Sequence, residues 1–191
     1  TARQGMSNVM NPRYDEGGVT LYQGDALRLL QAMPSGSVDA IITDPPYSSG
    51  GACRGDRLAL TTDKYLRSGA ATELRVPSFE GDNRDQRAFS SWCYLWLSDA
   101  LRVAREGAIV GIFTDWRQLP TMTDALQAGG WVWRGIVVWD KTGAARPCLG
   151  RFTAQCEYLL WGSRGPLPLN RPVPVLPGVY WHPAPRGADR V

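Results

Sequence analysis

Hydrophobic and polar residues follow one another along the chain in a pattern that predicts short strands and helices in succession. Residues 19–22 (VTLY) read as a strand, and Asp25 is placed to cap a helix that runs to about Met33. Residues 38–43 (VDAIIT) form an apolar run of the kind that is buried on both faces in a parallel sheet. This run stops abruptly at Asp44-Pro45-Pro46-Tyr47.

The second half of the chain continues this succession of strands and helices, after a stretch in which apolar residues show almost no regular spacing. Residues 48–85 hold Gly, Ser, Thr and charges of both signs, which predicts a long loop or insertion. A helix is expected from about Gln86 to Arg105, ended by Gly107, and its aromatic stripe is more typical of core than of a base-stacking surface. The further elements expected are a strand over 108–114, a helix over 116–128, and strands over 131–139 and 155–161.

Alternating strands and helices at this spacing predict an α/β fold with parallel strands and flanking helices. A length of 191 residues suits one domain, with residues 1–165 as its core. Residues 166–191 carry seven of the 14 prolines, so they are expected to form an extended arm or a binding segment rather than a central strand or helix. No run of 18 apolar residues is present, so neither a transmembrane helix nor any other membrane role is expected.

Charge is unevenly distributed, and almost all basic groups are arginine. The net charge is +3, and Lys64 and Lys141 are the only lysines among 21 basic residues, which leaves 19 Arg. Arginine suits phosphate and base edges, although a coding bias toward arginine explains the count equally well. Residues 1–47 sum to −2 (three Arg against five acids) and residues 146–191 to +4 (six Arg against two acids). The C-terminal segment is therefore expected either to follow a phosphate backbone or to be a solvated tail.

The cysteines and the single histidine argue against several common active sites. No two cysteines form a C-x-x-C pair and none has a nearby histidine, so no metal site is expected, and Cys93 is expected in the core. His182 lies in the proline-rich stretch, which leaves a serine or cysteine hydrolase triad without supporting context. Nothing suggests an oxidising compartment, which favours the cytoplasm.

The tetrapeptide Asp44-Pro45-Pro46-Tyr47 carries the strongest chemical signal, because ligands of open α/β sheets bind where strands end. Two prolines fix the backbone and remove two N–H donors, so the corner presents a carboxylate, free carbonyl groups and one aromatic ring. Asp44 and the Pro45 carbonyl are two acceptors that suit an –NH₂ group, and Tyr47 offers a face for stacking. An exocyclic amine on a planar base fits this corner, and two acceptors would draw its nitrogen toward a tetrahedral, nucleophilic geometry.

These residues resemble the catalytic motif of the S-adenosylmethionine-dependent DNA amino-methyltransferases, which modify N6 of adenine or N4 of cytosine. The likeness includes the lead-in LYQGDALRLLQAMPSGSVDAIITDPPY (21–47), Trp139-Asp140-Lys141, and QCEYLLW (155–161), and so covers most of residues 19–165. It implies a Rossmann-like methyltransferase sheet with flanking helices, S-adenosylmethionine as cofactor and DNA as partner. A homodimer is left open.

The resemblance assigns roles to the residues of the corner. Asp44 would hold the target amine and contact the cofactor, Pro45 and Pro46 would shape the pocket, and Tyr47 would stack on the base. The base must leave the duplex to reach them, because its amine is otherwise inside the stack. The family's cytosine-N4 members more often carry Ser at the first motif position, so Asp44 favours adenine N6. Cytosine N4 and an RNA substrate remain alternatives, as does a non-catalytic nucleic-acid-binding remnant.

Residues outside the corner receive roles that compete with structural ones. Asp25 is similar to the family's acidic contact to the cofactor, and a helix cap fits it at least as well. Trp139 would line the base pocket or lie in the core, and Lys141 would meet a phosphate or be solvated. The segment after the last predicted strand, which would have to recognise the DNA sequence, is short. This predicts weak, phosphate-dominated recognition of a short or relaxed target site. The groups expected to supply it are Arg164, Arg171, Arg186, Arg190 and the loop over 48–85.

One family feature has no counterpart in the sequence. The cofactor loop of the family, a Phe-x-Gly-x-Gly-type strand end, is not found, and Gly50-Gly51 and Gly129-Gly130 lack its spacing. In family members whose Asp-Pro-Pro-Tyr motif lies near the N-terminus, the cofactor loop follows the target-recognition region. The present sequence ends at Val191, about where the segment that precedes this loop would begin. We therefore expect a sheet incomplete at its C-terminus, through truncation rather than disorder or degeneration. We also expect weak or absent binding of S-adenosylmethionine by these 191 residues alone. Restriction, prophage and regulatory settings are all compatible with these features.

Overall fold

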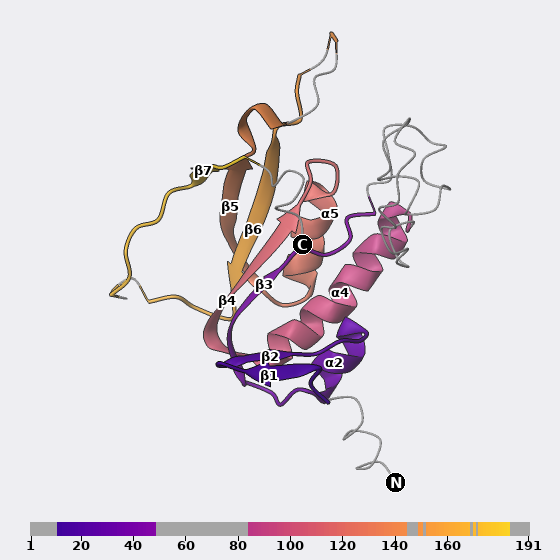
Figure 1. Cartoon of the computed structure of the whole chain (residues 1–191), viewed down its shortest axis with the longest axis vertical. Coiled ribbons are helices and arrows are strands. Elements are labelled where there is room, and N and C mark those ends of the chain that lie inside the picture. Colours follow the sequence, from indigo (N-terminus) through magenta and orange to yellow (C-terminus); the bar gives the residue numbers. More distant parts are fainter. Residues whose placement is uncertain are drawn as a thin grey trace.

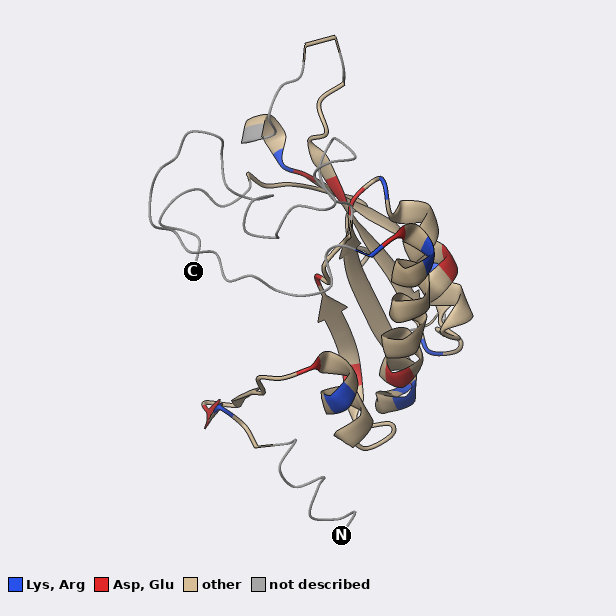
Figure 2. Cartoon of the chain, turned by 90° about the vertical axis from the view of Figure 1, so that its right-hand side faces the viewer, with Lys and Arg blue, Asp and Glu red and all other residues tan. Residues whose placement is uncertain are grey.

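The computed structural model describes residues 11–48, 84–144, 149–150, 152–168, 170 and 172–183. A five-stranded sheet carries the three α-helices on one side, and a small two-stranded hairpin lies beside its lower end (Figures 1 and 2). The helices are α2 (Ala26–Ala32), α4 (Gln86–Val103), α5 (Leu119–Ala128) and the short 3-10 helix η2 (Thr142–Ala144). The strands of the sheet are β3 (Val38–Thr43), β4 (Ala104–Thr114), β5 (Val132–Asp140), β6 (Cys156–Ser163) and β7 (Val179–Trp181).

The sheet is mixed rather than parallel throughout, with the order β3-β4-β6-β5-β7. β3 runs parallel to β4, and β7 runs parallel to β5, whereas β6 is antiparallel to both of its neighbours. The expectation of parallel strands is therefore wrong for β6, because β5 and β6 follow one another as a hairpin and consecutive hairpin strands must reverse. As a result, the carboxyl ends of β3, β4, β5 and β7 meet the amino end of β6 at one edge of the sheet. This edge is named the carboxyl edge below.

The first predicted strand exists but lies outside the main sheet. Val19–Leu21 forms β2 and pairs antiparallel with β1 (Tyr14–Glu16) in a separate hairpin. Gly17 and Gly18 make its two-residue turn with φ angles of +61° and +79°, a geometry that favours glycine at both positions. All six strand residues are exposed.

The core lies between α4, α5 and the sheet. Asp85 caps α4 by accepting a hydrogen bond from the Ala88 amide at 2.9 Å, as an N-cap carboxylate does. The helix then buries a stripe at helical spacing, which confirms that this stripe, Cys93 included, belongs to the core. The buried residues of α4 are Phe89, Cys93, Trp96, Leu97, Ala100 and Val103. They pack with Met122, Ala125 and Leu126 of α5 and with Val110, Ile112 and Leu160 of the sheet.

The end of α4 differs from the prediction. The helix stops at Val103 and β4 begins at Ala104, so Gly107 lies inside the strand with a φ angle of +77° instead of ending the helix. Pairing explains the early stop, since Val38 of β3 is already in register with Ala104. Helix α5 likewise begins at Leu119, three residues later than expected, because residues 116–118 form a turn.

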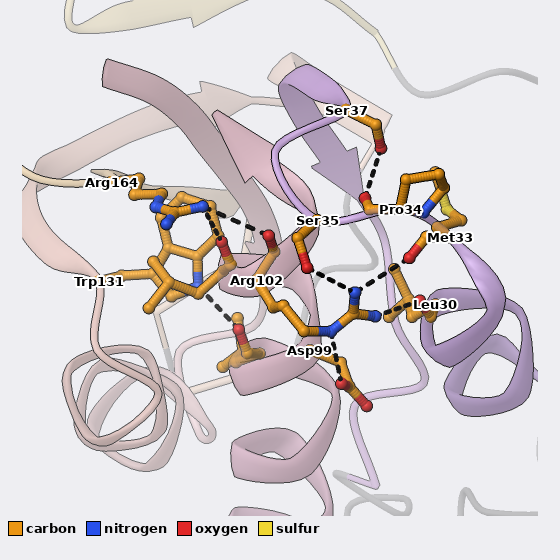
Figure 3. A network of polar contacts seen from close by, with 11 residues as sticks. Leu30, Met33, Pro34, Ser35, Ser37, Asp99, Arg102, Trp131 and Arg164 are labelled. Atoms are coloured by element: carbon orange, nitrogen blue, oxygen red, sulfur yellow. Dashed lines mark hydrogen bonds and ion pairs between the residues drawn. The ribbon is translucent and has the colours of Figure 1, made fainter. Parts of the chain in front are cut away.

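Two arginines tie the end of α4 to neighbouring segments (Figure 3). Arg102 donates to the carbonyl oxygens of Leu30 at 2.6 Å and Met33 at 2.9 Å, which lie at the end of α2. Its guanidinium also lies 3.5 Å from the Asp99 carboxylate. Arg164 donates to the Leu101 carbonyl at 3.1 Å and so binds the last turn of α4. Both contacts place positive charge at helix carboxyl ends, where the helix dipole favours it.

Strand β3 is an edge strand and is not buried on both faces as its apolar sequence predicted. Within the described residues it pairs with β4 and with no other strand, and Ile42 is 78% exposed. An apolar run in the sequence indicates a strand, but the burial of that strand depends on which neighbouring elements cover its two faces. None of the helices in the described part of the chain is long and apolar enough to cross a membrane.

Candidate functional site

The corner after β3 places Asp44 and Tyr47 in direct contact at the carboxyl edge. The Tyr47 hydroxyl donates to Asp44 Oδ1 at 2.6 Å, a short distance typical of a hydrogen bond to an ionised acceptor. Pro45 is buried and Asp44 is exposed, so the rigid proline holds the carboxylate toward solvent. Ser48 closes the corner with a φ angle of +49°, an uncommon conformation for a residue that is not glycine.

The environment of Tyr47 keeps its hydroxyl protonated. Burial raises the pKa of Tyr47 well above its usual range, and the hydrogen bond to Asp44 raises it further. The negative charges of Asp44, Glu157 and Asp115 act in the same direction. Tyr47 is therefore a hydrogen-bond donor at any working pH, and three carboxylates from three different strand ends gather around it.

A turn after β4 contacts this corner, and the sequence does not predict the contact. Asp115 Oδ1 accepts hydrogen bonds from the backbone amides of Arg117 and Gln118, both at 3.0 Å. The Gln118 side chain is almost fully buried, and its Nε2 lies 3.5 Å from the Ser48 carbonyl oxygen. The available signal was the position of Asp115 directly after a buried strand, which is where ligand-binding residues of such sheets occur.

Trp116 stands on the same turn and faces solvent. It is 57% exposed, and the guanidinium carbon of Arg117 lies 5.3 Å from the centre of its ring. Such a stacked arginine restrains the ring by a cation–π contact. The turn thus presents an exposed indole at the carboxyl edge, after the strand next to the one that leads to Asp44.

Trp139 and Lys141, both predicted as site residues, lie at the carboxyl edge near the ends of β5 and β6. Trp139 meets Phe113 edge to face, with ring centres 6.3 Å apart, and its Nε1 donates to the His182 carbonyl at 2.7 Å. Lys141 Nζ donates to Glu157 Oε1 at 2.8 Å, in a pair whose side chains are only 18% and 26% exposed. The lysine is therefore ion-paired at the site rather than freely solvated, while its contact to phosphate stays a prediction.

A cavity of about 500 Å³ opens beside the corner, on the face of the sheet that carries α2 and α4. Its volume lies in the range of small-molecule sites. Asp44 and Thr43 supply polar groups at one end, and the remaining wall is almost entirely apolar. The other lining residues are Tyr22, Ala26, Leu29, Leu30, Met33, Ile41, Ile42, Pro45, Pro46, Trp92, Trp96 and Ala100.

The other predicted residues are placed differently. Asp25 is confirmed as the cap of α2, since its carboxylate accepts from the Arg28 amide at 3.1 Å, and it stands next to Ala26 of the cavity wall. Arg164 follows β6 at the opposite edge of the sheet, where its guanidinium binds the end of α4, so it is not grouped with the corner. Arg171, Arg186, Arg190 and most of the 48–85 loop lie outside the described residues.

Known proteins are similar to this chain in sequence. A family profile described as DNA methylase (N6_N4_Mtase) matches residues 38–174, well over half of the chain. The chain belongs to this family of DNA methylases. It is 26% identical to the type II methyltransferase M.ScaI of Streptomyces caespitosus over 163 residues, 82% of this chain and 44% of that protein. It is 25% identical to the type II methyltransferase M.HinfI of Haemophilus influenzae over 147 residues, 76% of this chain and 38% of that protein.

Solved structures show the same fold in DNA methyltransferases. The PvuII DNA methyltransferase, described as cytosine-N4-specific, superposes with a TM-score of 0.63 at 13% identity, over 92% of this chain and 61% of that one. The complex of M1.HpyAVI with SAM superposes with a TM-score of 0.53 at 18% identity, over 88% and 66%. These likenesses establish a Rossmann-like methyltransferase fold for this chain. The chain spans about half the length, or less, of the two sequence relatives described above.

Proposed function

We propose that this DNA methylase transfers a methyl group from S-adenosylmethionine to N6 of adenine in DNA. The observation that carries the proposal is the corner itself, an exposed Asp44 on a rigid proline support with Tyr47 bonded to its carboxylate. Such a corner offers acceptors and a ring face at the edge of an open α/β sheet, where ligands of this class of fold bind.

The chemistry follows from the hydrogen-bonding groups. An exocyclic amine is a poor nucleophile, because its lone pair is delocalised into the ring. Acceptors at Asp44 and at the Pro45 carbonyl would bind its two hydrogens and favour a tetrahedral nitrogen whose lone pair points at an electrophile. Tyr47 fixes one oxygen of the carboxylate, and the other oxygen has no partner among the described residues, which leaves it available to the amine.

The target base must leave the duplex to reach Asp44, since an amine inside the base stack is not accessible to this edge of the sheet. Extrusion costs a few kcal/mol, which stacking and hydrogen bonds in the pocket would offset. Tyr47 and Trp139 supply aromatic surface close to the carboxylates of the site for that purpose.

The apolar cavity fits the cofactor. S-adenosylmethionine supplies an electrophilic methyl group on a sulfonium centre. The ring of Tyr22 and the aliphatic side chains of α2 suit its adenine ring, and Asp44 at the rim suits its polar or cationic groups. Asp25, next to this wall, is the proposed acidic contact. Each of these residues acts here by binding and by excluding water.

The decisive experiment is mass analysis of nucleosides from DNA incubated with the full-length protein and S-adenosylmethionine. N6-methyl-2′-deoxyadenosine is the expected product, because the corner begins with Asp rather than Ser. If N4-methylcytosine is found instead, the protein is a DNA methyltransferase that acts on cytosine rather than adenine. If the full-length protein binds DNA but neither binds S-adenosylmethionine in a calorimetric titration nor yields either product, the proposal is overturned in favour of a non-catalytic nucleic-acid-binding role.

A further inference from the structure

The turn after β4 presents an aromatic side chain that the proposed chemistry leaves unused. Trp116 is 57% exposed, although tryptophan has a large apolar surface whose burial is favourable. It lies at the carboxyl edge, on a segment that follows β4, the strand paired directly with β3. An exposed tryptophan next to a base-binding corner is therefore positioned to meet whatever approaches that corner.

The turn that carries Trp116 is held by hydrogen bonds on the C-terminal side of the ring. Asp115 fixes the turn through two backbone amides, and the Gln118 amide reaches across to the Ser48 carbonyl, 70 residues away in sequence. Arg117 restrains the ring from one side. Ordering a side chain on binding usually costs free energy, so an aromatic ring that is already fixed binds more tightly than a mobile one.

The aromatic ring itself selects the part of DNA that fits. The charge around it is mixed, because Asp44, Asp115 and Glu157 act on Tyr47 while Glu157 is paired with Lys141 and Arg117 lies over the Trp116 ring. An indole offers no charge to a phosphate group, whereas its flat apolar face matches the uncharged face of a base. Aromatic side chains bind bases of any sequence by stacking on that face.

We propose that Trp116 stacks on a nucleobase of the DNA strand beside the flipped target base, with Arg117 and Gln118 as positioning residues. The contact replaces part of the stacking that the strand loses when the target base leaves the helix. This inference deepens the proposed function and rests on it for the identity of the partner. It adds a DNA-binding residue that lies outside the Asp-Pro-Pro-Tyr corner.

The test is DNA affinity, measured by fluorescence anisotropy of a labelled duplex that contains one mismatched adenine, which lowers the cost of flipping. Trp116→Ala is expected to weaken binding roughly 5- to 150-fold, the range found for losing one stacked base. Trp116→Phe, which keeps a ring, should stay within about threefold of the unmodified chain. Thermal unfolding of each variant confirms that the fold is kept.

Trp133→Ala is the matched control. Trp133 is also an exposed tryptophan, at 40%, but it lies near the start of β5, about 20 Å along the strand from the carboxyl edge. Its loss should leave DNA affinity unchanged. The inference is overturned if Trp116→Ala and Trp133→Ala bind the duplex equally, whether both bind well or neither binds. It is also overturned if Trp116→Ala weakens S-adenosylmethionine binding in calorimetry instead, since the ring would then contact the cofactor.

Failure of the proposed function looks different. If the unmodified chain forms no methylated nucleoside but its DNA affinity still depends on Trp116, the stacking contact stands and the enzymatic role falls. If methylation proceeds and neither its KM for DNA nor the affinity changes in Trp116→Ala, the enzymatic role stands and the stacking contact falls.

Discussion

The Tyr47 hydroxyl and the Asp44 carboxylate form a 2.6 Å hydrogen bond that joins the two ends of the Asp-Pro-Pro-Tyr corner. The bond spans three residues, and the two prolines between its ends restrict how either residue can move. It therefore fixes the direction of the carboxylate and of the tyrosine ring together. Burial and neighbouring carboxylates raise the pKa of Tyr47, so the donor is present across the pH range in which an enzyme works.

Tyr47→Phe removes this donor and keeps the ring. We expect kcat/KM for methylation to fall roughly tenfold, because about 1.4 kcal/mol of positioning is lost while stacking remains. Tyr47→Ala should lose about another tenfold or more, since it also removes the ring face. Steady-state kinetics with a tritiated methyl donor measures both. Equal activity in Tyr47→Phe and the unmodified protein would show that the hydroxyl does not position the carboxylate.

Asp44→Ala removes the proposed acceptor of the target amine. Methylation should fall by about 100-fold or more, the cost of deleting one preorganised group that stabilises a reacting centre. Stability should change by less than about 0.5 kcal/mol, because Asp44 is exposed and Tyr47 is its partner among the described residues. Asp44→Asn keeps one carbonyl acceptor and should be intermediate. Substantial turnover by Asp44→Ala in the presence of saturating DNA would remove Asp44 from its role.

Local patterns in the sequence were enough to predict the long elements. Helix α4 was recognised because its apolar spacing repeats over 18 residues, and the burial of Phe89 and Cys93 follows from that spacing alone. The corner was recognised because Asp44, two prolines and Tyr47 are adjacent in sequence, so their chemistry can be seen without a fold. Asp25 was identified as a cap for the same reason, since a cap acts on an amide three residues away.

Features that depend on distant contacts were not predictable in this way. The braced turn of Trp116 depends on a contact between Gln118 and Ser48, and nothing near either residue reveals the other. The reversed direction of β6 and the exposure of Ile42 depend on which strands become neighbours. The charge of Arg164 favours a phosphate contact, which stays a prediction, but its bonds to carbonyls of a helix some 60 residues earlier are not visible in the sequence.

Arg102→Ala should destabilise the fold by roughly 2–3 kcal/mol. The guanidinium bonds the carbonyls of Leu30 and Met33, and hydrogen bonds to charged groups contribute about 1.5–3 kcal/mol each when buried and less when half-exposed. Arg105→Ala is the control, since Arg105 lies three residues further along and joins the start of β4 to Gly36 and to an exposed pair with Asp39 of β3. That variant should cost less than about 1 kcal/mol. Urea unfolding measures both, and equal losses would refute a special role for Arg102.

The buried Cys93 predicts how stability depends on alkaline pH. Burial raises the pKa of its thiol from 9.0 to about 12. Between these values the unfolded chain releases the thiol proton and the folded chain keeps it, so unfolding becomes more favourable as the pH rises. The contribution is fully present below pH 9 and declines by at most about 1.4 kcal/mol for each pH unit above it.

Comparison of Cys93→Ala with the unmodified protein isolates this effect, because all other titrating groups are shared. The variant should be less stable at pH 8, since it leaves a small cavity in the core. From pH 8 to pH 10, however, the unmodified protein should lose about 1.4 kcal/mol more of its unfolding free energy than the variant does, so the two profiles converge. Urea unfolding at several pH values measures this difference. Parallel profiles would mean that the Cys93 thiol titrates alike in the folded and unfolded chains, which its complete burial against Phe89 and Trp96 in the core argues against.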